Sequence, residues 1–400
     1  MAEFNPFDPA FIENPYPFFH ALREEDPVHA HPMGFYVLTR YDDVMTLLRD
    51  SRFGKAAYEE LLASRFGGNG GGGAWVTSSM LFKDPPDHTR LRTLVSKAFT
   101  PRVVETMRAH IQEIVDGLLD QVQARGRMDV ISDLAYPLPV TVISEMLGVP
   151  PAESDSIKEW SLAIARSLDA IAMPVDQEVI QKGNAAFKAL AAYFQDLATA
   201  RRRAPRADLL SALIAAEEQG DKLSERELLA TCILLYVAGH ETTVNLIGNG
   251  VLALLRHPAE LRRLAANPGL APGAVEELLR YDGPVQRTGR IASTDVEIGG
   301  KTIPKGTLVL GLLGAANRDP AHFPEPDRLD LERADNRHLA FGLGIHFCLG
   351  APLARLEGQM AFATLLRRCP RLELATPSPT WRSSATLRGL TALPVSFRST

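Results

Sequence analysis

The chain of 400 residues has little cysteine, no long hydrophobic run and no recognisable targeting segment. Its three cysteines, Cys232, Cys348 and Cys369, are far apart and form no Cys-x-x-Cys pair, which argues against a disulfide framework or a structural zinc site. The apolar run from Thr231 to Gly239 is too short to span a bilayer, and the N-terminus has neither a basic nor an apolar signal region. We therefore expect a cytoplasmic protein without a membrane anchor.

The chain also lacks a large excess of charge of one sign and a nucleotide-binding motif. The net charge of -5 gives no indication of a nucleic-acid surface, and the 46% of hydrophobic residues are enough for a large core. No Gly-x-Gly-x-x-Gly fingerprint within a βαβ unit is present, and no flavin or iron-sulfur module is attached. The chain therefore carries no redox nucleotide module of its own.

A glycine-rich loop from Phe341 to Gly350 presents a single cysteine, Cys348, and leads into a helix that begins near Ala351, with Pro352 in its first turn. The N-terminus of a helix favours an anion, so a thiolate would be stabilised there. The alternative is a structural cysteine, since free cysteine is among the most buried residue types. For the cysteine taken alone, the structural interpretation is the better one.

A second pattern, Asp84 to Arg92, opens a helix with prolines in its first turn. His88 and Arg92 are four residues apart and so share one helix face, where they can bind a carboxylate. Taken singly, both are better explained as surface residues.

A long helix is predicted from the capping box at Ser224 to about His257. Gly239, Glu241 and Thr242 interrupt its apolar middle, where glycine costs about 1 kcal/mol and an unpaired charge considerably more. Such costs, taken together, indicate a functional site.

Strands are predicted near the N-terminus and between Gln286 and Leu313. The residues from Val28 to Thr39 alternate around Gly34 like a hairpin. A second hairpin is predicted from Val296 to Ile298 and from Lys301 to Ile303, joined by two glycines.

The cysteine loop, with Phe341, Gly344, His346, Cys348 and Gly350 at fixed spacing, resembles the haem-binding loop of the cytochrome P450 family. The Pro-Pro-x-His-x-x-x-Arg and Glu-x-x-Arg patterns also match this family, and the resemblance covers almost the whole chain. It implies a mainly α fold with small β-sheets, a long central helix and haem in the core. We expect one domain spanning residues 1–400.

The resemblance also implies roles for individual residues. Cys348 would ligate the iron of haem b, and Glu241 and Thr242 would guide protons toward oxygen. Other residues expected to contact the cofactor are His88, Arg92, Arg290, His346, Phe341 and Gly342. A structural group of Glu277, Arg280 and Arg328 would hold the cysteine loop. The residues expected to contact substrate are Phe66, Trp75, Leu81, Val237, Ala238, Val285 and Leu387.

The implied function is a monooxygenase that inserts one atom of O2 into a hydrophobic small molecule, most often by hydroxylation. Electrons would come from NAD(P)H through a ferredoxin or flavodoxin with its reductase, because the chain has no redox module. An acidic partner would dock on a basic patch. The residues expected in that patch are Arg90, Lys97, Arg102, Arg355, Arg367 and Arg368.

Three alternatives remain beside this function. The same fold can run a peroxide-driven oxidation, or the chain can bind haem without turnover, although a carrier has no need of the acid and alcohol at Glu241 and Thr242. A cysteine hydrolase using Cys348 with His346 or His240 needs the two side chains in contact. Residues two apart on one loop meet that requirement poorly.

The stretch from Gly67 to Gly73 is of low complexity. We interpret it as a lid over the substrate side of the haem pocket. A solvated insertion without a role is the alternative.

Overall fold

The computed structural model describes residues 4–55, 57–66, 76–218 and 223–398. The chain divides into two compact units, and each is described by itself below. The first unit comprises Met1–Phe53, Val104–Pro139 and Thr242–Thr400. The second comprises Gly54–Val103 and Val140–Glu241.

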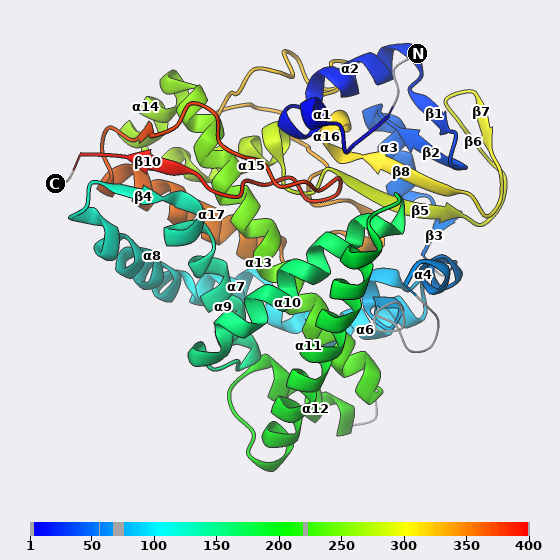
Figure 1. Cartoon of the computed structure of the whole chain (residues 1–400), viewed down its shortest axis with the longest axis horizontal. Helices are drawn as coiled ribbons and strands as arrows, with labels where there is room; N and C mark the ends of the chain where they lie inside the picture. Colours follow the sequence, from blue (N-terminus) through cyan, green and yellow to red (C-terminus); the bar gives the residue numbers. More distant parts are fainter. Residues whose placement is uncertain (1–3, 56, 67–75, 219–222, 399–400) are drawn as a thin grey trace. The chain divides into compact units, whose positions relative to one another are not determined.

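The first unit contains a five-stranded sheet in the order β1-β2-β8-β5-β3. Strands from near the N-terminus and strands from residues 287–312 meet in it, as the blue and yellow arrows of Figure 1 show. β2 (Phe35–Leu38) pairs in parallel with β8 (Leu308–Leu312), and β8 pairs antiparallel with β5 (Arg287–Ala292). β3 is Phe53–Gly54.

Both predicted hairpins are confirmed. β1 (Val28–His31) pairs antiparallel with β2 around Gly34, whose φ is +85°. β6 (Val296–Ile298) pairs with β7 (Lys301–Ile303) through two glycines with positive φ, the backbone that a tight hairpin turn requires.

A third, three-stranded sheet has the order β4-β10-β9. Its strands are β4 (Arg127–Asp129), β9 (Glu373–Leu374) and β10 (Pro394–Ser396).

Helix α3 (Tyr41–Arg49) packs on the five-stranded sheet. A Cβ added at Gly311 of β8 would lie 3.0 Å from the Leu47 side chain, so the helix and strand approach closely. Val44 and Leu47 belong to the buried cluster at this contact.

The other helices of the first unit cover its sheets and its core. They are α1 (Pro9–Glu13), α2 (Tyr16–Glu25), α8 (Arg108–Gln123), α14 (Pro258–Ala266), α15 (Ala271–Asp282), α16 (Leu313–Ala316) and α17 (Ala351–Arg368), with short turns at Ile131–Ala135, Pro268–Leu270 and Gly344–His346. Two helices, α7 (Pro101–Thr106) and α9 (Pro137–Leu147), lie where the chain passes from one unit to the other.

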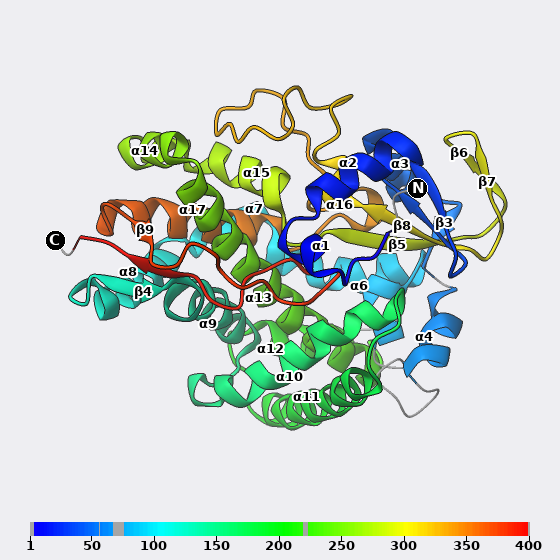
Figure 2. The same cartoon turned by 45° about the horizontal axis from the view of Figure 1, so that its top comes forward.

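The second unit is helical in its described part. Two of its helices, α10 (Ser154–Ser167) and α11 (Gln177–Arg203), run side by side in both views (Figures 1 and 2). Its other elements are α4 (Tyr58–Phe66), α6 (Asp87–Ser96), α12 (Leu209–Glu218) and short turns at Met80–Phe82, Lys97–Phe99, Pro151–Glu153 and Leu168–Ile171.

The long helix α13 spans Glu225–Arg256, as predicted to within a residue at each end. Its capping box is formed, because the Glu227 amide donates to Ser224 Oγ and the Ser224 amide donates to the Glu227 carboxylate. The boundary between the two units falls inside this helix, between Glu241 and Thr242.

Among the described residues, no helix is both long enough and apolar enough to cross a membrane.

Candidate active site

The cysteine loop is shaped by backbone that only glycine adopts readily. Gly342 and Gly344 have φ angles of +67° and +71°. The Cys348 amide donates to the Phe341 carbonyl at 2.9 Å, and the Phe347 amide donates to the Gly344 carbonyl at 3.0 Å. These bonds close the loop on itself and present Cys348 at the start of α17.

Gly344 is also required for space. A Cβ at this position would lie 2.7 Å from the Leu48 carbonyl oxygen, which belongs to the last turn of α3. A backbone atom cannot move aside cheaply, so the loop lies against α3 only because residue 344 has no side chain.

Exposure distinguishes Cys348 from the other two cysteines. Cys348 is partly exposed, whereas Cys232 and Cys369 are buried. Burial raises the pKa of Cys232 to about 12 and that of Cys369 to about 11. Only Cys348 therefore combines access from outside with a helix N-terminus, the setting that favours a reactive thiolate.

An ion cluster supports the aromatic residue that opens the loop. The Arg355 guanidinium lies 4.6 Å from the centre of the Phe341 ring and bonds both oxygens of Glu276, at 2.6 and 2.8 Å. His338 Nε2 lies 3.1 Å from Glu276. Burial alone would raise the pKa of Glu276, but the hydrogen bonds from Arg355 and His338 outweigh it and lower that pKa to about 2.

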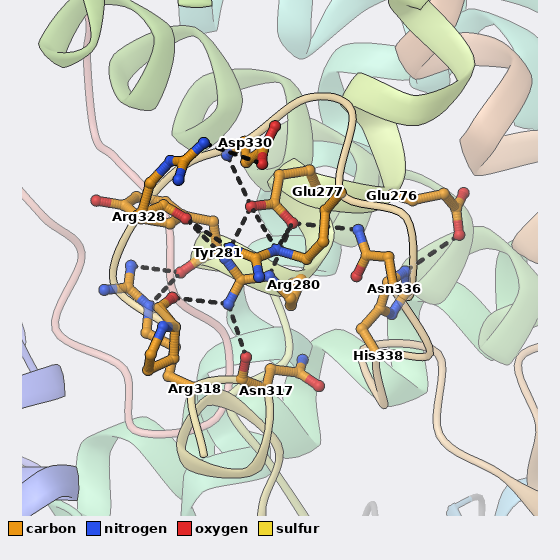
Figure 3. A network of polar contacts seen from close by, with 12 residues as sticks. Glu276, Glu277, Arg280, Tyr281, Asn317, Arg318, Arg328, Asp330, Asn336 and His338 are labelled. Atoms are coloured by element: carbon orange, nitrogen blue, oxygen red, sulfur yellow. Dashed lines mark hydrogen bonds and ion pairs between the residues drawn. The ribbon is translucent and has the colours of Figure 1, made fainter. Parts of the chain in front are cut away.

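The Glu-x-x-Arg pair is fully buried and lies at the centre of a second network (Figure 3). Arg280 donates to both oxygens of Glu277, at 2.7 and 2.8 Å. It also donates to the carbonyls of Asn317, Pro326 and Arg328. The network thus joins α15 to the irregular segment that precedes the cysteine loop.

The prediction that the Arg328 side chain is the third member of this group is wrong. Its guanidinium bonds Glu325 and Asp330 instead, and its side chain is 57% exposed. The guanidinium that reaches Glu277 is that of Arg333, at 3.2 and 3.3 Å, and its side chain is 10% exposed. Arg328 contributes its backbone carbonyl, which accepts hydrogen bonds from both Arg280 and Arg333.

The network reaches the cysteine loop through Asn317. The Asn317 carbonyl accepts from Arg280, and its side-chain oxygen accepts from the Leu339 amide at 2.7 Å. The Leu339 carbonyl in turn accepts from the Gly342 amide at 2.8 Å. A continuous chain of hydrogen bonds therefore connects the buried ion pair to the loop.

The residues expected to bind carboxylates are divided between the units. Arg290 is buried on β5 in the first unit, where it donates to Thr288 Oγ1 and to the Gly289 carbonyl. His346 is half-buried on the cysteine loop. His88 is buried and Arg92 half-buried one turn apart on α6, in the second unit.

Two of the expected substrate contacts are brought together from distant segments. Val285 and Leu387 form an isolated antiparallel bridge, and both are half-buried. Next to it, the buried Arg287 donates to Thr386 Oγ1 at 3.2 Å. Arg287 could not be found from the sequence, since a cation on a strand has no local signature.

The other expected substrate contacts are only partly described. Leu81 is exposed, and on α13 Val237 is nearly buried while the adjoining Ala238 is exposed. Trp75 and the glycine stretch from Gly67 to Gly73 lie outside the described residues, as does the side chain of Phe66.

The polar segment of α13 is buried as predicted. His240 and Glu241 are almost fully buried, and Thr242 is half-buried. The segment around Gly239 lies within the continuous α-helix α13. Glycine serves close packing here, since a Cβ would lie 2.9 Å from the Ile143 side chain.

The expected basic patch is largely neutralised by ion pairs within each unit. Arg90 bonds Glu227 at 2.5 Å, Arg355 bonds Glu276, and Arg368 bonds Asp116 and Asp120. Arg367 lies 3.8 Å from Asp116. Lys97 and Arg102 are exposed.

Comparison with known proteins agrees with this geometry. Residues 27–267 and 270–394 match the family model described as Cytochrome P450. The chain is 47% identical over 377 residues to Cytochrome P450 CYP107DY1 of Priestia megaterium, covering 90% of this chain and 89% of that protein. It is 44% identical over 399 residues to the Biotin biosynthesis cytochrome P450 of Bacillus subtilis, covering 97% of each.

A solved structure shows the same fold. P450BioI in complex with hexadec-9Z-enoic acid ligated acyl carrier protein has a TM-score of 0.89 and 42% identity, covering 97% of this chain and 99% of that one. The chain therefore belongs to the cytochrome P450 family, as a bacterial-type haem-thiolate monooxygenase.

The donor set fits a haem-thiolate group. The cofactor needs one accessible sulfur and cationic partners for its carboxylates. Cys348 supplies the first, and Arg290 and His346 are buried or half-buried donors in the same unit. Among the described residues, no group of three or more His, Cys, Asp or Glu is arranged to hold a bare metal ion.

Proposed function

We propose that this enzyme inserts one atom of O2 into a hydrophobic small molecule by hydroxylation, with electrons from NAD(P)H. The observation that carries the proposal is the partly exposed Cys348, held at the start of α17 by a loop that closes on the Phe341 carbonyl. Neither of the other cysteines is accessible. We also propose a cytoplasmic location, where NAD(P)H is available, and a single functional domain made of both units.

We assign haem b as the cofactor, with Cys348 as the residue that would ligate its iron. His88, Arg92, Arg290 and His346 would hold its two propionates, because each offers a cationic or N–H donor. The remaining contacts that we assign to the cofactor are Phe341 and Gly342 on the cysteine loop. When bound, the thiolate-ligated haem supplies the oxidising power of the reaction.

The chain's own contribution to the reaction is the control of protons and water. Glu241 offers a carboxyl group and Thr242 a hydroxyl group, on adjacent residues of one helix. We propose that these two groups would hold and pass on the protons that the reaction consumes. Their burial keeps bulk water away from that path.

The substrate would contact an apolar surface formed in part by the bridge between Val285 and Leu387. The other residues assigned to substrate binding are Phe66, Trp75, Leu81, Val237 and Ala238. A fatty acyl chain, terpenoid, steroid or polyketide fits such a lining. The acyl chain in the P450BioI complex makes fatty acyl compounds the first class to screen.

A ferredoxin or flavodoxin with its reductase would supply the electrons. Because ion pairs neutralise most of the expected patch, the exposed Lys97 and Arg102 are the charges that we assign to docking. Charge reversal at both should slow reduction of the enzyme and weaken its salt dependence. Unchanged kinetics would contradict this assignment.

The absorption spectrum of the reduced protein with carbon monoxide tests the proposed cofactor. A thiolate-ligated haem gives a distinctive Soret position, and a protein without that band would refute the assignment of Cys348. A compound that shifts the haem spectrum then serves as substrate for a second test. Thr242→Ala should keep consuming NAD(P)H while product falls and peroxide rises, and unchanged coupling would refute the proton-delivery role.

A further inference from the structure

One buried amide on α13 holds two segments that come from distant parts of the first unit. Asn249 is 1% exposed, and its Nδ2 donates to the Asp282 carbonyl at 3.2 Å and to the Arg388 carbonyl at 3.1 Å. Carbonyl oxygens only accept hydrogen bonds, so these two partners determine which way the amide group points. The Asn249 side chain therefore joins α13 to the end of α15 and to the C-terminal segment.

The two segments pair with each other directly beyond this amide. Residues 284–286 and 386–388 form a short antiparallel ladder, with backbone hydrogen bonds of 2.8 and 3.0 Å. The bridge between Val285 and Leu387, the proposed substrate contacts, lies between these two bonds. Asn249 bonds both segments at the same end of the ladder, so it fixes where that end lies against α13.

A second contact, one turn earlier on α13, also brings the C-terminal segment close to the helix. A Cβ added at Gly389 would lie 1.9 Å from Asn245 Oδ1 and 2.3 Å from Asn245 Cγ. Asn245 is 1% exposed, so its amide has little room to move aside. The chain passes this closely only because residue 389 has no side chain.

Both asparagines share a face of α13 with Thr242. The three residues follow the spacing i, i+3 and i+7, which places them in one stripe along the helix. Thr242 is the residue that we assign to proton delivery, and Leu387 precedes the residue whose carbonyl Asn249 holds. The position of the ladder on this stripe therefore determines how far Leu387 lies from Thr242.

Packing alone does not account for an asparagine at position 249. Its Oδ1 atom is buried without a hydrogen-bond partner, and an unsatisfied buried oxygen destabilises the folded state. An apolar side chain of similar size would fill the space without that cost. The contribution of Asn249 therefore lies in the two carbonyls that its nitrogen holds.

We propose that Asn249 is a positioning residue that sets the distance between Leu387 and Thr242, and through it the substrate atom that is hydroxylated. The inference rests on the proposed function, which assigns Leu387 to substrate binding. A misplacement of about 1 Å is enough to change how a substrate meets its reacting groups. Without the amide, this end of the ladder moves away from α13, and the substrate is held in more than one position.

Three substitutions separate positioning from a general loss of stability. Asn249→Leu keeps the approximate size of the side chain and removes both hydrogen bonds. Gly389→Ala keeps both donors but places a Cβ against Asn245, which forces the segment away from α13. Tyr16→Phe is the matched control, because it removes a hydrogen bond of 2.7 Å to the Asp282 side chain and leaves both carbonyls with Asn249.

The direct readout is amide hydrogen exchange of the haem-loaded protein, followed by mass spectrometry. Peptides that cover residues 284–286 and 386–388 report the opening of the ladder. We expect Asn249→Leu to raise their exchange rates by about tenfold or more, the effect of losing two hydrogen bonds. Gly389→Ala should also raise these rates, whereas Tyr16→Phe should stay within about twofold of the wild type. A peptide that covers β10 is the internal control and should not change.

The second readout is the distribution of hydroxylated products from hexadecanoic acid, a member of the proposed fatty acyl class, with a surrogate ferredoxin and its reductase. Asn249→Leu and Gly389→Ala should spread hydroxylation over additional carbon atoms and lower the share of the main wild-type product by about twofold or more. Tyr16→Phe should give the wild-type distribution.

Equal exchange rates in the wild type and Asn249→Leu would overturn the proposal. Faster exchange with an unchanged product distribution would also overturn it, and so would the same changes in Tyr16→Phe. If Asn249→Leu fails to fold, Gly389→Ala decides by the same criteria. A wild type that hydroxylates no fatty acid would instead refute the proposed substrate class, while the exchange rates would still decide whether Asn249 positions the ladder.

Discussion

Arg333, rather than Arg328, should be the arginine on which the stability of the cysteine loop depends. We predict that Arg333→Ala destabilises the protein severely, whereas Arg328→Ala is nearly neutral. Both variants remove one guanidinium from the same irregular segment, five residues apart. Each therefore serves as the control for the other.

The magnitudes follow from the contacts and burial of each side chain. Arg333 donates to both Glu277 oxygens and to three backbone carbonyls. Its side chain is 10% exposed. Removing one partner of a buried ion pair costs about 3–5 kcal/mol. Since Arg280 still compensates the Glu277 charge, we expect about 2–4 kcal/mol for Arg333→Ala.

The expected cost of Arg328→Ala is much smaller. Its guanidinium pairs only with Glu325 and Asp330 at the surface, and such pairs contribute about 0–1 kcal/mol. The carbonyl that Arg328 gives to the network is retained in the alanine variant. We therefore expect a difference of about 2 kcal/mol or more between the two variants.

Urea unfolding, followed by circular dichroism and by the Soret band, measures this difference. A bound cofactor makes unfolding depart from two states and stabilises the folded protein, so all variants must be compared at the same haem and protein concentrations. Equal midpoints for the two variants would refute the assignment of Arg333. So would a midpoint for Arg333→Ala that matches the wild type.

Three further predictions concern the same unit. Cys348→Ser should remove the thiolate Soret band of the reduced carbon monoxide complex, because a hydroxyl is not a thiolate. Gly344→Ala should destabilise the loop by about 2 kcal/mol or more and lower the haem content, because alanine strains the positive φ and its Cβ meets the Leu48 carbonyl. Gly350→Ala is the control and should be tolerated, because nothing lies within 4 Å of a Cβ at that position. Glu276→Gln should be less stable than the wild type above about pH 4.5, on the order of 2 kcal/mol, with the difference vanishing toward about pH 2.

The sign of the last prediction follows from a lowered pKa. A carboxyl whose pKa falls from 4.5 to about 2 on folding stabilises the native state above about pH 4.5, and that contribution is lost as the pH falls through the lower value. Urea midpoints across this range measure it, and a difference that grows in acid would contradict it. An unchanged spectrum would contradict the prediction for Cys348→Ser. A Gly344→Ala variant with the same haem content as Gly350→Ala would contradict the prediction for Gly344.

The sequence was most informative where one local rule determines structure. Two glycines between alternating residues predicted the hairpin at Val296–Ile298 and Lys301–Ile303, and a capping box predicted the start of α13. The fixed spacing around Cys348 predicted the family. In each case residues that are close in sequence make the contacts that define the element.

The errors arose where contacts are made across irregular segments. Arg328 and Arg333 lie in a stretch without periodicity, so nothing local tells which guanidinium turns inward to Glu277. The close approach of Gly239 to Ile143 was not predicted either, because Ile143 lies almost a hundred residues earlier in the chain. Arg287 was missed for the same reason, because its partner Thr386 is distant in sequence.

The contact between Gly344 and the last turn of α3 also orders events during synthesis. Leu48 leaves the ribosome long before Gly344 is translated, and the parallel pairing of β2 with β8 likewise joins segments made early and late. At about 5–20 residues per second, the early segment waits many seconds for its partner. The sheet on which α3 packs is therefore complete only when most of the chain has been made. A nascent chain that ends before Gly344 therefore has α3 but not yet the cysteine loop that packs on it.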